Sequence, residues 1–543
     1  MSSEPYPLVN EPEDRLCKIC KRKLHVQKTR KKTEITLSGK TVTTLVSYYC
    51  PDHPEEIIRP SNPLTPKRSI YGYDVIAETG RLRFIENKQI REIHDYFMDR
   101  GLNIPTRTIH WLCDRFLHYL MAVHCENMPK INELIKKNGG YVLHIDSSGR
   151  RGPMILLLRD GWSGIRILAA PIKSEGSEYV IPHLKTIKKH LGDPVAAIRD
   201  MSKGFKTALT KIFPNAYIIT CHYHFLKNIA KTLFEPFYPR FRNRIDRLGI
   251  KKRLRDFRKV LVRRNGKDEE DNVTLRLIEH ILSYDKDGEG LAYPFSLPAV
   301  YFYRRCLESA DRARQMILAR AKRNEFSPLL GILEDILKRL QPPPAVLGRL
   351  RTDFDDLQIR WKWFQRVRVA LRYRNGPIPL STEIKLSDKE LEKGRSKLDR
   401  LINEIDESLD QGGSDHHARK LRRSLRKVSK MMKDNREELL APNVMVEANG
   451  KETIKKLPRT NQPDEIDFRM ARRHVRRIRG NSDVEQQFQR DGPGLLMVHN
   501  LQDREYVRMV FGTLGQMAAR YSKVTSESLL AVKPFMCNSR PIQ

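Results

Sequence analysis

Short apolar runs alternate with helical patterns between residues 140 and 220 of the chain. The runs YVLHID, PMILLLRDGW and GIRILAAPI predict three β-strands separated by turns, and VAAIRD and AYIITC predict two more. Apolar residues at helical spacing, from Val180 to Leu191 and in KGFKTALTKIF, predict a helix before and after the fourth strand. The order βββαβαβ therefore predicts an α/β domain, with a mixed sheet and helices on both of its faces.

Two helical patterns precede this domain and predict a helix-turn-helix in residues 61–130. Pro105 and Thr106 begin the second helix, and Gly101 separates it from the first. Arg107 and His110 stand at its start, where a recognition helix contacts the major groove of DNA. The alternative is a plain helical pair in a linker. The first pattern predicts one amphipathic helix with apolar residues at Phe84, Ile85, Ile90, Ile93 and Phe97.

A long, basic and helical region divides the predicted α/β core. Residues 240–264 are dense in Arg and Lys, and two heptad-like patterns lie between about 385 and 435. The segment QGGSD joins the two patterns, so we expect an antiparallel helical hairpin there. Residues 236–454 are therefore predicted to form an all-α insertion, which leaves residues 138–235 and 455–520 for the core.

The charge balance points to a polyanionic partner. The chain carries 101 Lys and Arg against 66 Asp and Glu, a net charge of +35, which favours binding to nucleic acid. A membrane surface would also attract it, but no apolar run reaches the ~18 residues that a spanning helix needs. The acidic N-terminus lacks the apolar stretch of a secretion signal, so we expect a cytoplasmic protein with no membrane partner.

Four residues near the N-terminus have the spacing of zinc ligands. Cys17 and Cys20 form one pair, and Cys50 and His53 form a second pair after a strand-like stretch. Two such pairs separated by a β-rich segment are typical of a zinc ribbon with a structural, tetrahedral Zn²⁺ ion. We therefore expect a zinc-ribbon-like module in residues 1–60, and the alternative is that the four residues are incidental.

Three carboxylates could hold a pair of metal ions. Asp146 and Asp200 each follow an apolar strand, and Glu465 lies near the start of an arginine-rich helix. Carboxylate oxygens suit Mg²⁺ or Mn²⁺, and two such ions can clamp the attacking and leaving oxygens of a phosphodiester. Aspartates are also common in turns at strand ends, and Glu465 could merely pair with Arg469. Glu485 is the rival for the third ligand.

Other residues are predicted to contact DNA or to support the carboxylates. The predicted phosphate contacts are basic residues on two segments: Lys251, Lys252 and Arg253 in the insertion, and Arg469, Arg472, Arg473 and Arg476 on the helix face that carries Glu465. Cys221 and His224 directly follow the fifth strand, where they could orient the site or be purely structural. No Walker loop, GxSxG elbow or dinucleotide glycine motif is present.

Three motifs together resemble a known family. They are HIDSSG at Asp146, RDMSKG followed by FPNAYIITCHYHFLKNI at Asp200, and RTNQPDEIDFRMARRHVRRIRG at Glu465. They are similar to those of DDE-type prokaryotic insertion-sequence transposases with a Mutator-like layout, in which a helical insertion separates the second Asp from the Glu. The likeness covers roughly residues 15–230 and 455–515. It implies an RNase H-like catalytic core preceded by modules that bind transposon ends.

The resemblance also implies a mechanism and partners. Two Mg²⁺ ions held by Asp146, Asp200 and Glu465 would serve strand cleavage at the ends of a mobile element, and the freed 3′-hydroxyl would then attack target DNA. The expected partners are double-stranded DNA, as terminal repeats and as target, and a second copy of the chain in a dimer or larger assembly on DNA. We would then expect the protein at the nucleoid.

Two alternatives remain open at this point. One is an RNase H-like nuclease that cuts DNA without strand transfer. The other is a non-catalytic, domesticated DNA-binding protein, whose binding to DNA would not depend on the carboxylate of Asp146.

Overall fold

The computed structural model describes residues 6–12, 14–60, 62, 64–149, 152–264, 268–288, 291–340, 344–373, 384–410, 416–480 and 484–535. The chain forms two compact units, which are described separately below. The first unit comprises Met1–Ile218, Met445–Lys455 and Pro463–Gln543, and the second comprises Ile219–Val444 and Lys456–Gln462.

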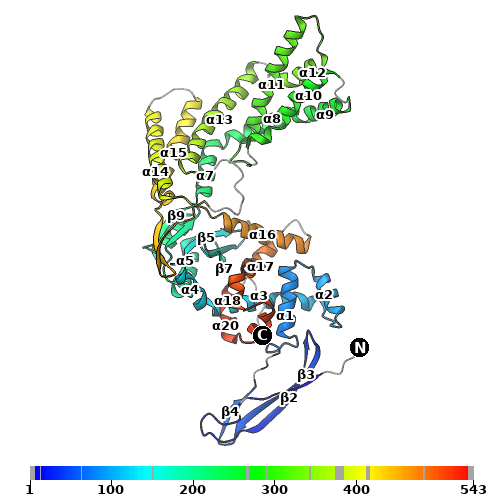
Figure 1. The fold of residues 1–543 in the computed structure, drawn as a ribbon, viewed down its shortest axis with the longest axis vertical. Helices are drawn as coiled ribbons and strands as arrows, with labels where there is room; N and C mark the ends of the chain where they lie inside the picture. The colour runs from blue at the N-terminus through cyan, green and yellow to red at the C-terminus, as the bar shows by residue number, and fades with distance from the viewer. Residues whose placement is uncertain are drawn as a thin grey trace. The chain divides into compact units, whose positions relative to one another are not determined.

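A five-stranded mixed sheet forms the centre of the first unit (Figure 1). Its strands are β5 (Val142–Ser148), β6 (Met154–Asp160), β7 (Arg166–Ile172), β8 (Ala196–Arg199) and β9 (Tyr217–Thr220), in the order β7-β6-β5-β8-β9. The central strand β5 runs antiparallel to β6 and parallel to β8. The strands therefore form where the five apolar runs predict them, and most of their side chains are buried.

Helices pack around this sheet. Helices α5 (Ser177–Leu191) and α6 (Lys203–Ile212) contact β7 and β8, and α17 (Glu485–Val498) contacts β6 and β7. Helix α17 also packs on α3 (Thr106–Glu126). Gly494 permits that approach, because a Cβ atom there would lie 2.9 Å from the side chain of Leu117. The other helices in this part of the chain are α4 (Met128–Lys137), α16 (Gln462–Arg479), α18 (Arg504–Val510), α19 (Met517–Tyr521) and α20 (Ser526–Ala531).

The single helix predicted from Phe84 to Phe97 is not found. The chain instead forms α1 (Tyr73–Gly80), a π-helical turn (Arg81–Ile85) and a separate helix α2 (Ile90–Met98). The break falls at Asn87, which adopts the left-handed backbone conformation with φ of 59°. A capping box between Gln89 and Glu92 then starts α2. The second predicted helix, α3, begins at Thr106 as expected.

A four-stranded sheet lies near the N-terminus. It contains β1 (Tyr6–Asn10), β2 (His25–Thr36), β3 (Gly39–Cys50) and β4 (His53–Ile58), with β3 as the strand to which the other three pair. The buried apolar residues at one end of this sheet are few: Cys17, Leu24, Val46, Tyr48 and Cys50.

The second unit is helical. One group of packed helices comprises α8 (Phe237–Arg247), α9 (Ile250–Arg263), α10 (Glu269–Leu282), α11 (Pro298–Ala321) and α12 (Pro328–Lys338) (Figure 1). The other comprises α7 (His222–Phe234), α13 (Pro344–Ala370), α14 (Asp388–Asp410) and α15 (His416–Leu439). Helices α14 and α15 pack against each other, as the heptad-like patterns predict, and QGGSD at 411–415 lies outside the described residues.

The segment predicted to be helical up to residue 454 ends in strands instead. β10 (Val444–Ala448) and β11 (Lys451–Lys455) form a two-stranded hairpin. Asn449 and Gly450, with φ of 53° and 72°, make its two-residue turn. Asn-Gly between alternating residues is a strong local signal for such a hairpin, and it was visible in VMVEANGKETIK.

Within the described ranges, none of the helices combines the length and apolar character needed to cross a membrane.

Candidate functional site

Asp146 and Asp200 occupy matching positions on neighbouring strands. Strands β5 and β8 pair in parallel, with His144 opposite Ile198. Asp146 comes two residues after His144, and Asp200 comes two residues after Ile198, directly past the end of β8. Because parallel strands present their carboxyl ends at one edge of a sheet, the two aspartates lie at the same edge.

The two aspartates differ in their exposure. Asp146 is only 5% exposed, whereas Asp200 is half-buried. The carboxylates accept backbone hydrogen bonds of 2.8 Å: Oδ1 of Asp146 from the amide of Ser147, and Oδ1 of Asp200 from the amide of Ser202. Carboxylates at a sheet edge with restricted access to water favour binding of a cation, since burial makes an uncompensated negative charge costly.

The first turn of α16 approaches this edge of the sheet. It carries Asp464, which is fully buried, and Glu465, which is half-buried. Burial raises the pKa of Asp464 well above its usual range, and the nearby charge of Asp146 adds to that rise. Asp464 also lies 4.0 Å from Arg159, which stands opposite His144 of β5 on the neighbouring strand β6, so the start of α16 lies beside these two strands.

Asp467 anchors α16 to the sheet through buried ion pairs, which the sequence patterns did not predict. Its carboxylate binds the Arg166 guanidinium through two hydrogen bonds of 2.6 and 2.9 Å, and it also contacts Nδ1 of His499 at 3.1 Å. Burial alone would raise its pKa, but the hydrogen bonds from His499 and Arg166 outweigh it and hold that pKa below the usual range. Arg159 lies 3.8 Å from Asp467 and 4.0 Å from Asp464.

A sequence signal for these two acids did exist. Asp464, Asp467, Phe468, Ala471 and Val475 recur at helical spacing, and all five are buried. Acidic residues on an otherwise apolar helix face require buried partners, so the pattern indicates an internal charge network. It does not identify those partners, which come from β6, β7 and the segment after α17.

Glu485, the rival third ligand, is engaged in an ion pair. Both of its carboxylate oxygens contact the Arg472 guanidinium, at 3.3 and 3.4 Å. Arg472 also donates to Oγ of Ser148, at the end of β5, and lies over the ring of Phe488. Arg472 therefore links β5, α16 and α17, and is less available to DNA than predicted.

The other predicted DNA contacts fall into two groups. Exposed side chains are found at Arg107, His110, Lys252, Arg253, Arg469, Arg473 and Arg476. Lys251 is held within the second unit, where its ammonium contacts Asp246 at 3.2 Å and lies over the rings of Tyr284 and Phe302. Lys251 thus packs helices together and is not a free phosphate contact.

Cys221 and His224 lie at the start of α7 in the second unit. Sγ of the buried Cys221 accepts a hydrogen bond from the backbone amide of Asn461, and the amide of His222 donates to the carbonyl of Arg459. These contacts hold the segment that directly precedes α16 in the sequence. Cys221 therefore supports the chain leading to Glu465, while the ring of His224 packs edge-on against Tyr223.

The predicted zinc ligands converge. The ligand atoms of Cys17, Cys20, Cys50 and His53 all lie within 4.8 Å of one another. The individual separations are 3.5 Å between Cys20 and Cys50, 3.7 Å between Cys50 and His53, and 3.8 Å between Cys17 and His53. A tetrahedron with Zn–S bonds of ~2.3 Å has edges of about 3.8 Å, so the cluster could hold a structural zinc ion.

The electrostatics of the cluster favour a metal as well. A hydrogen bond from the Cys20 backbone lowers the pKa of the Cys17 thiol to about 7. A thiol with that pKa is about half ionised at neutral pH, and the thiolate is the form that binds metal.

The three predicted Mg²⁺ ligands are not drawn together in the same way. Among the described residues, only the Cys17 cluster brings three or more His, Cys, Asp or Glu side chains together with all their ligand atoms within 4.8 Å of one another. Asp146, Asp200 and Glu465 do not form such a group. Like-charged carboxylates repel each other, and a cation between them removes that repulsion. The structure thus places Asp146 and Asp200 at one edge of the sheet and the first turn of α16 beside β6, but the ligand atoms of the three carboxylates do not all lie within 4.8 Å of one another.

The two buried acids of α16 should respond oppositely to substitution. Asp467→Asn is expected to lower the free energy of unfolding by about 3–5 kcal/mol, because it leaves Arg166 without its buried partner. Asp464→Asn should leave that free energy equal or higher, because neither oxygen of Asp464 has a hydrogen-bond partner among the described residues. Urea unfolding followed by fluorescence compares them, and an equal loss in both variants would contradict the assignment.

Comparison with known proteins does not extend this description: no family model matches the chain, and no curated protein matches it.

Proposed function

We propose that the chain is a transposase that cuts DNA at the ends of a mobile element and joins the freed ends to target DNA. The observation that carries this proposal is the matching of Asp146 and Asp200 on the parallel pair β5 and β8, with the acidic first turn of α16 beside β6, the other neighbour of β5. The five strands also form a mixed sheet with helices packed on it, as the resemblance implies for an RNase H-like core.

The donor set fits the metal that this chemistry needs. Asp146, Asp200 and Glu465 offer carboxylate oxygens, the ligands that Mg²⁺ and Mn²⁺ prefer. When bound there, two such ions would polarise the scissile phosphate and lower the pKa of the attacking water or hydroxyl. Glu465 is taken as the third ligand because it stands in the first turn of α16 next to Asp464, which lies 4.0 Å from Arg159 of β6.

The chain's own groups would bind and align the DNA. Arg469, Arg473 and Arg476 are exposed along α16 and could hold phosphates on the path to the carboxylates. The bidentate contact between Arg166 and Asp467 would keep α16 in register with the sheet. The N-terminal zinc ribbon and the helices α2 and α3 would bind the element's ends, and two ends held together would require a dimer or larger assembly.

Strand transfer separates this proposal from its alternatives. Labelled DNA fragments from both flanks of the gene are incubated with the full chain, Mg²⁺ and a supercoiled plasmid. A transposase should join the labelled 3′-ends to the plasmid. Cleavage without joining would support the nuclease alternative. DNA binding without any Mg²⁺-dependent cleavage would support the non-catalytic one.

A further inference from the structure

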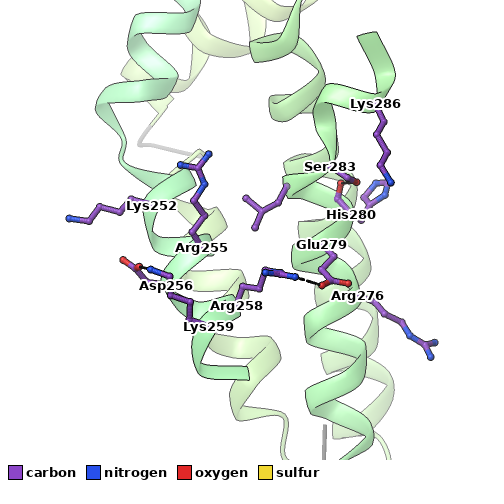
Figure 2. A pocket seen from close by; sticks show the side chains of 11 residues that line it. Lys252, Arg255, Asp256, Arg258, Lys259, Arg276, Glu279, His280, Ser283 and Lys286 are labelled. Atoms are coloured by element: carbon purple, nitrogen blue, oxygen red, sulfur yellow. Dashed lines mark hydrogen bonds and ion pairs between the residues drawn. The ribbon is translucent and has the colours of Figure 1, made fainter. Parts of the chain in front are cut away.

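A wide groove lies on the second unit between α9 and α10. It encloses about 950 Å³ and is continued by the short helical turn Tyr284–Gly288 (Figure 2). Six basic side chains line it: Lys252, Arg255, Arg258, Lys259, Arg276 and Lys286. No part of the site proposed above uses this groove as a whole, although Lys252 was among the predicted DNA contacts.

The acids of the groove are already neutralised. Arg258 on α9 binds Glu279 on α10 at 2.9 Å, and this pair crosses the groove from one helix to the other (Figure 2). Lys259 lies 3.4 Å from Asp256, one turn earlier on α9. The other four cations, Lys252, Arg255, Arg276 and Lys286, form no ion pair with any described residue and are exposed. The groove therefore presents an uncompensated charge of about +4.

The walls of the groove are fixed by packing. Leu254 and Leu261 of α9 are buried, as are Leu277, Ile278 and Ile281 of α10. Lys251, next to Lys252, lies over the rings of Tyr284 and Phe302 and so ties α9 to α11. The free cations thus project from a preformed surface, which lowers the entropic cost of binding a ligand.

The lining chemistry indicates what kind of ligand fits. Only one apolar side chain, Leu282, lines the groove, whereas pockets for small molecules are mostly apolar. The lining contains no Phe, Tyr or Trp, and its one aromatic ring, the imidazole of His280, is paired with Glu308, so it offers little surface on which unpaired bases could stack. In double-stranded nucleic acid the bases already stack on one another inside the duplex, so such a ligand needs only the phosphate contacts that this groove supplies.

We propose that the groove between α9 and α10 binds the phosphodiester backbone of double-stranded DNA, with Lys252, Arg255 and Arg276 as contacts from its two walls. The inference rests on the proposed function only in taking DNA as the partner, and it does not involve the carboxylates. It makes the helical insertion a second DNA-binding surface, independent of sequence, on a different unit from the carboxylates that would carry the chemistry.

Salt-dependent binding tests the groove. Fluorescence anisotropy of a labelled duplex of about 30 base pairs is measured between about 50 and 200 mM salt. The triple variant Lys252→Gln, Arg255→Gln, Arg276→Gln should reduce the slope of log K against log salt by about 2–3 and weaken binding at least ~10-fold. The charge-preserving variant Lys252→Arg should bind like the parent.

A matched control removes the same charge elsewhere on the second unit. Lys389, Lys393 and Lys397 lie exposed along α14, and their replacement by Gln should leave the slope within about one unit of the parent. Equal slopes for the groove and α14 variants would overturn the proposal. Loss of binding to a single-stranded oligonucleotide, with duplex binding intact, would identify the groove as a single-strand site and also overturn it. Circular dichroism checks that each variant keeps its helices.

The two proposals can fail separately. Groove-dependent duplex binding without Mg²⁺-dependent cleavage would support the groove and contradict the transposase proposal. Cleavage and strand transfer together with unchanged duplex binding by the groove variant would do the reverse.

Discussion

Asp146→Asn and Asp200→Asn are each expected to reduce Mg²⁺-dependent DNA cleavage about a thousandfold or more while leaving DNA binding intact. Each substitution removes a charged ligand oxygen but keeps the size of the side chain. Loss of about 4 kcal/mol of transition-state stabilisation corresponds to that factor. A gel assay of cleavage and a binding assay on the same duplex measure the two effects.

A metal-binding measurement tests the same two carboxylates without relying on catalytic activity. Mn²⁺ binding to the full chain, followed by electron paramagnetic resonance, should weaken about 100-fold in both variants. Asp193→Asn is the matched control, because Asp193 lies before β8, at the opposite end of that strand, and pairs with Lys188 at 2.8 Å. Unchanged Mn²⁺ affinity in Asp146→Asn would refute the metal site.

The Mn²⁺-binding and cleavage assays also show whether Glu465 or Glu485 is the third metal ligand. Glu465→Gln should lose Mn²⁺ affinity and cleavage together. Glu485→Gln should keep Mn²⁺ binding, and its effect should appear as reduced stability, since it frees the half-buried Arg472. The opposite result would transfer the role to Glu485 and leave the mechanism otherwise intact.

Loss of zinc is expected to unfold the N-terminal sheet. Structural zinc contributes about 10–16 kcal/mol of apparent binding free energy in small metal-dependent modules. The apolar core around the cluster contains few residues besides Cys17 and Cys50, so the sheet has little else to stabilise it at that end. We expect about one zinc ion per chain, and rapid proteolysis of residues 6–60 after removal of zinc or in Cys17→Ser.

Another cysteine provides the control for this prediction. Cys125 is free and half-buried on α3, away from the cluster in sequence, and Cys125→Ser should retain both the zinc and the protease resistance. Elemental analysis measures zinc, and mass spectrometry locates the cleavage sites. Purified chain without zinc, or a protease-resistant Cys17→Ser variant, would show that the four ligands do not hold a structural metal.

Local patterns predicted the elements that carry the candidate site, and they did so for a physical reason. A short apolar run between turns is sufficient to form a buried strand, and β5 to β9 lie where such runs occur. The same reasoning failed between Phe84 and Phe97. Apolar periodicity reports which residues face the core, and it continues across the break at Asn87 because both sides of the break are packed on that core.

Local patterns could not predict which charged side chains are held by partners inside the protein and which are exposed. Arg472 and Lys251 resemble their exposed neighbours in the sequence, yet each is held by partners within its own unit. Asp467 depends on Arg166, which is 301 positions away in the chain, and on His499. Such pairing depends on which distant elements pack together, and no local spacing encodes it.

The amino-acid sequence by itself therefore determined where the strands lie along the chain, which of them end in an aspartate, and which two pairs of residues are the candidate zinc ligands. Each of these features follows from local spacing. Only the tertiary structure decided that Asp146 and Asp200 lie at the same edge of neighbouring strands, that Asp464 and Asp467 are buried, and that a basic groove separates α9 from α10. These features arise from contacts between segments far apart in the chain, where burial and Coulombic pairing act through space.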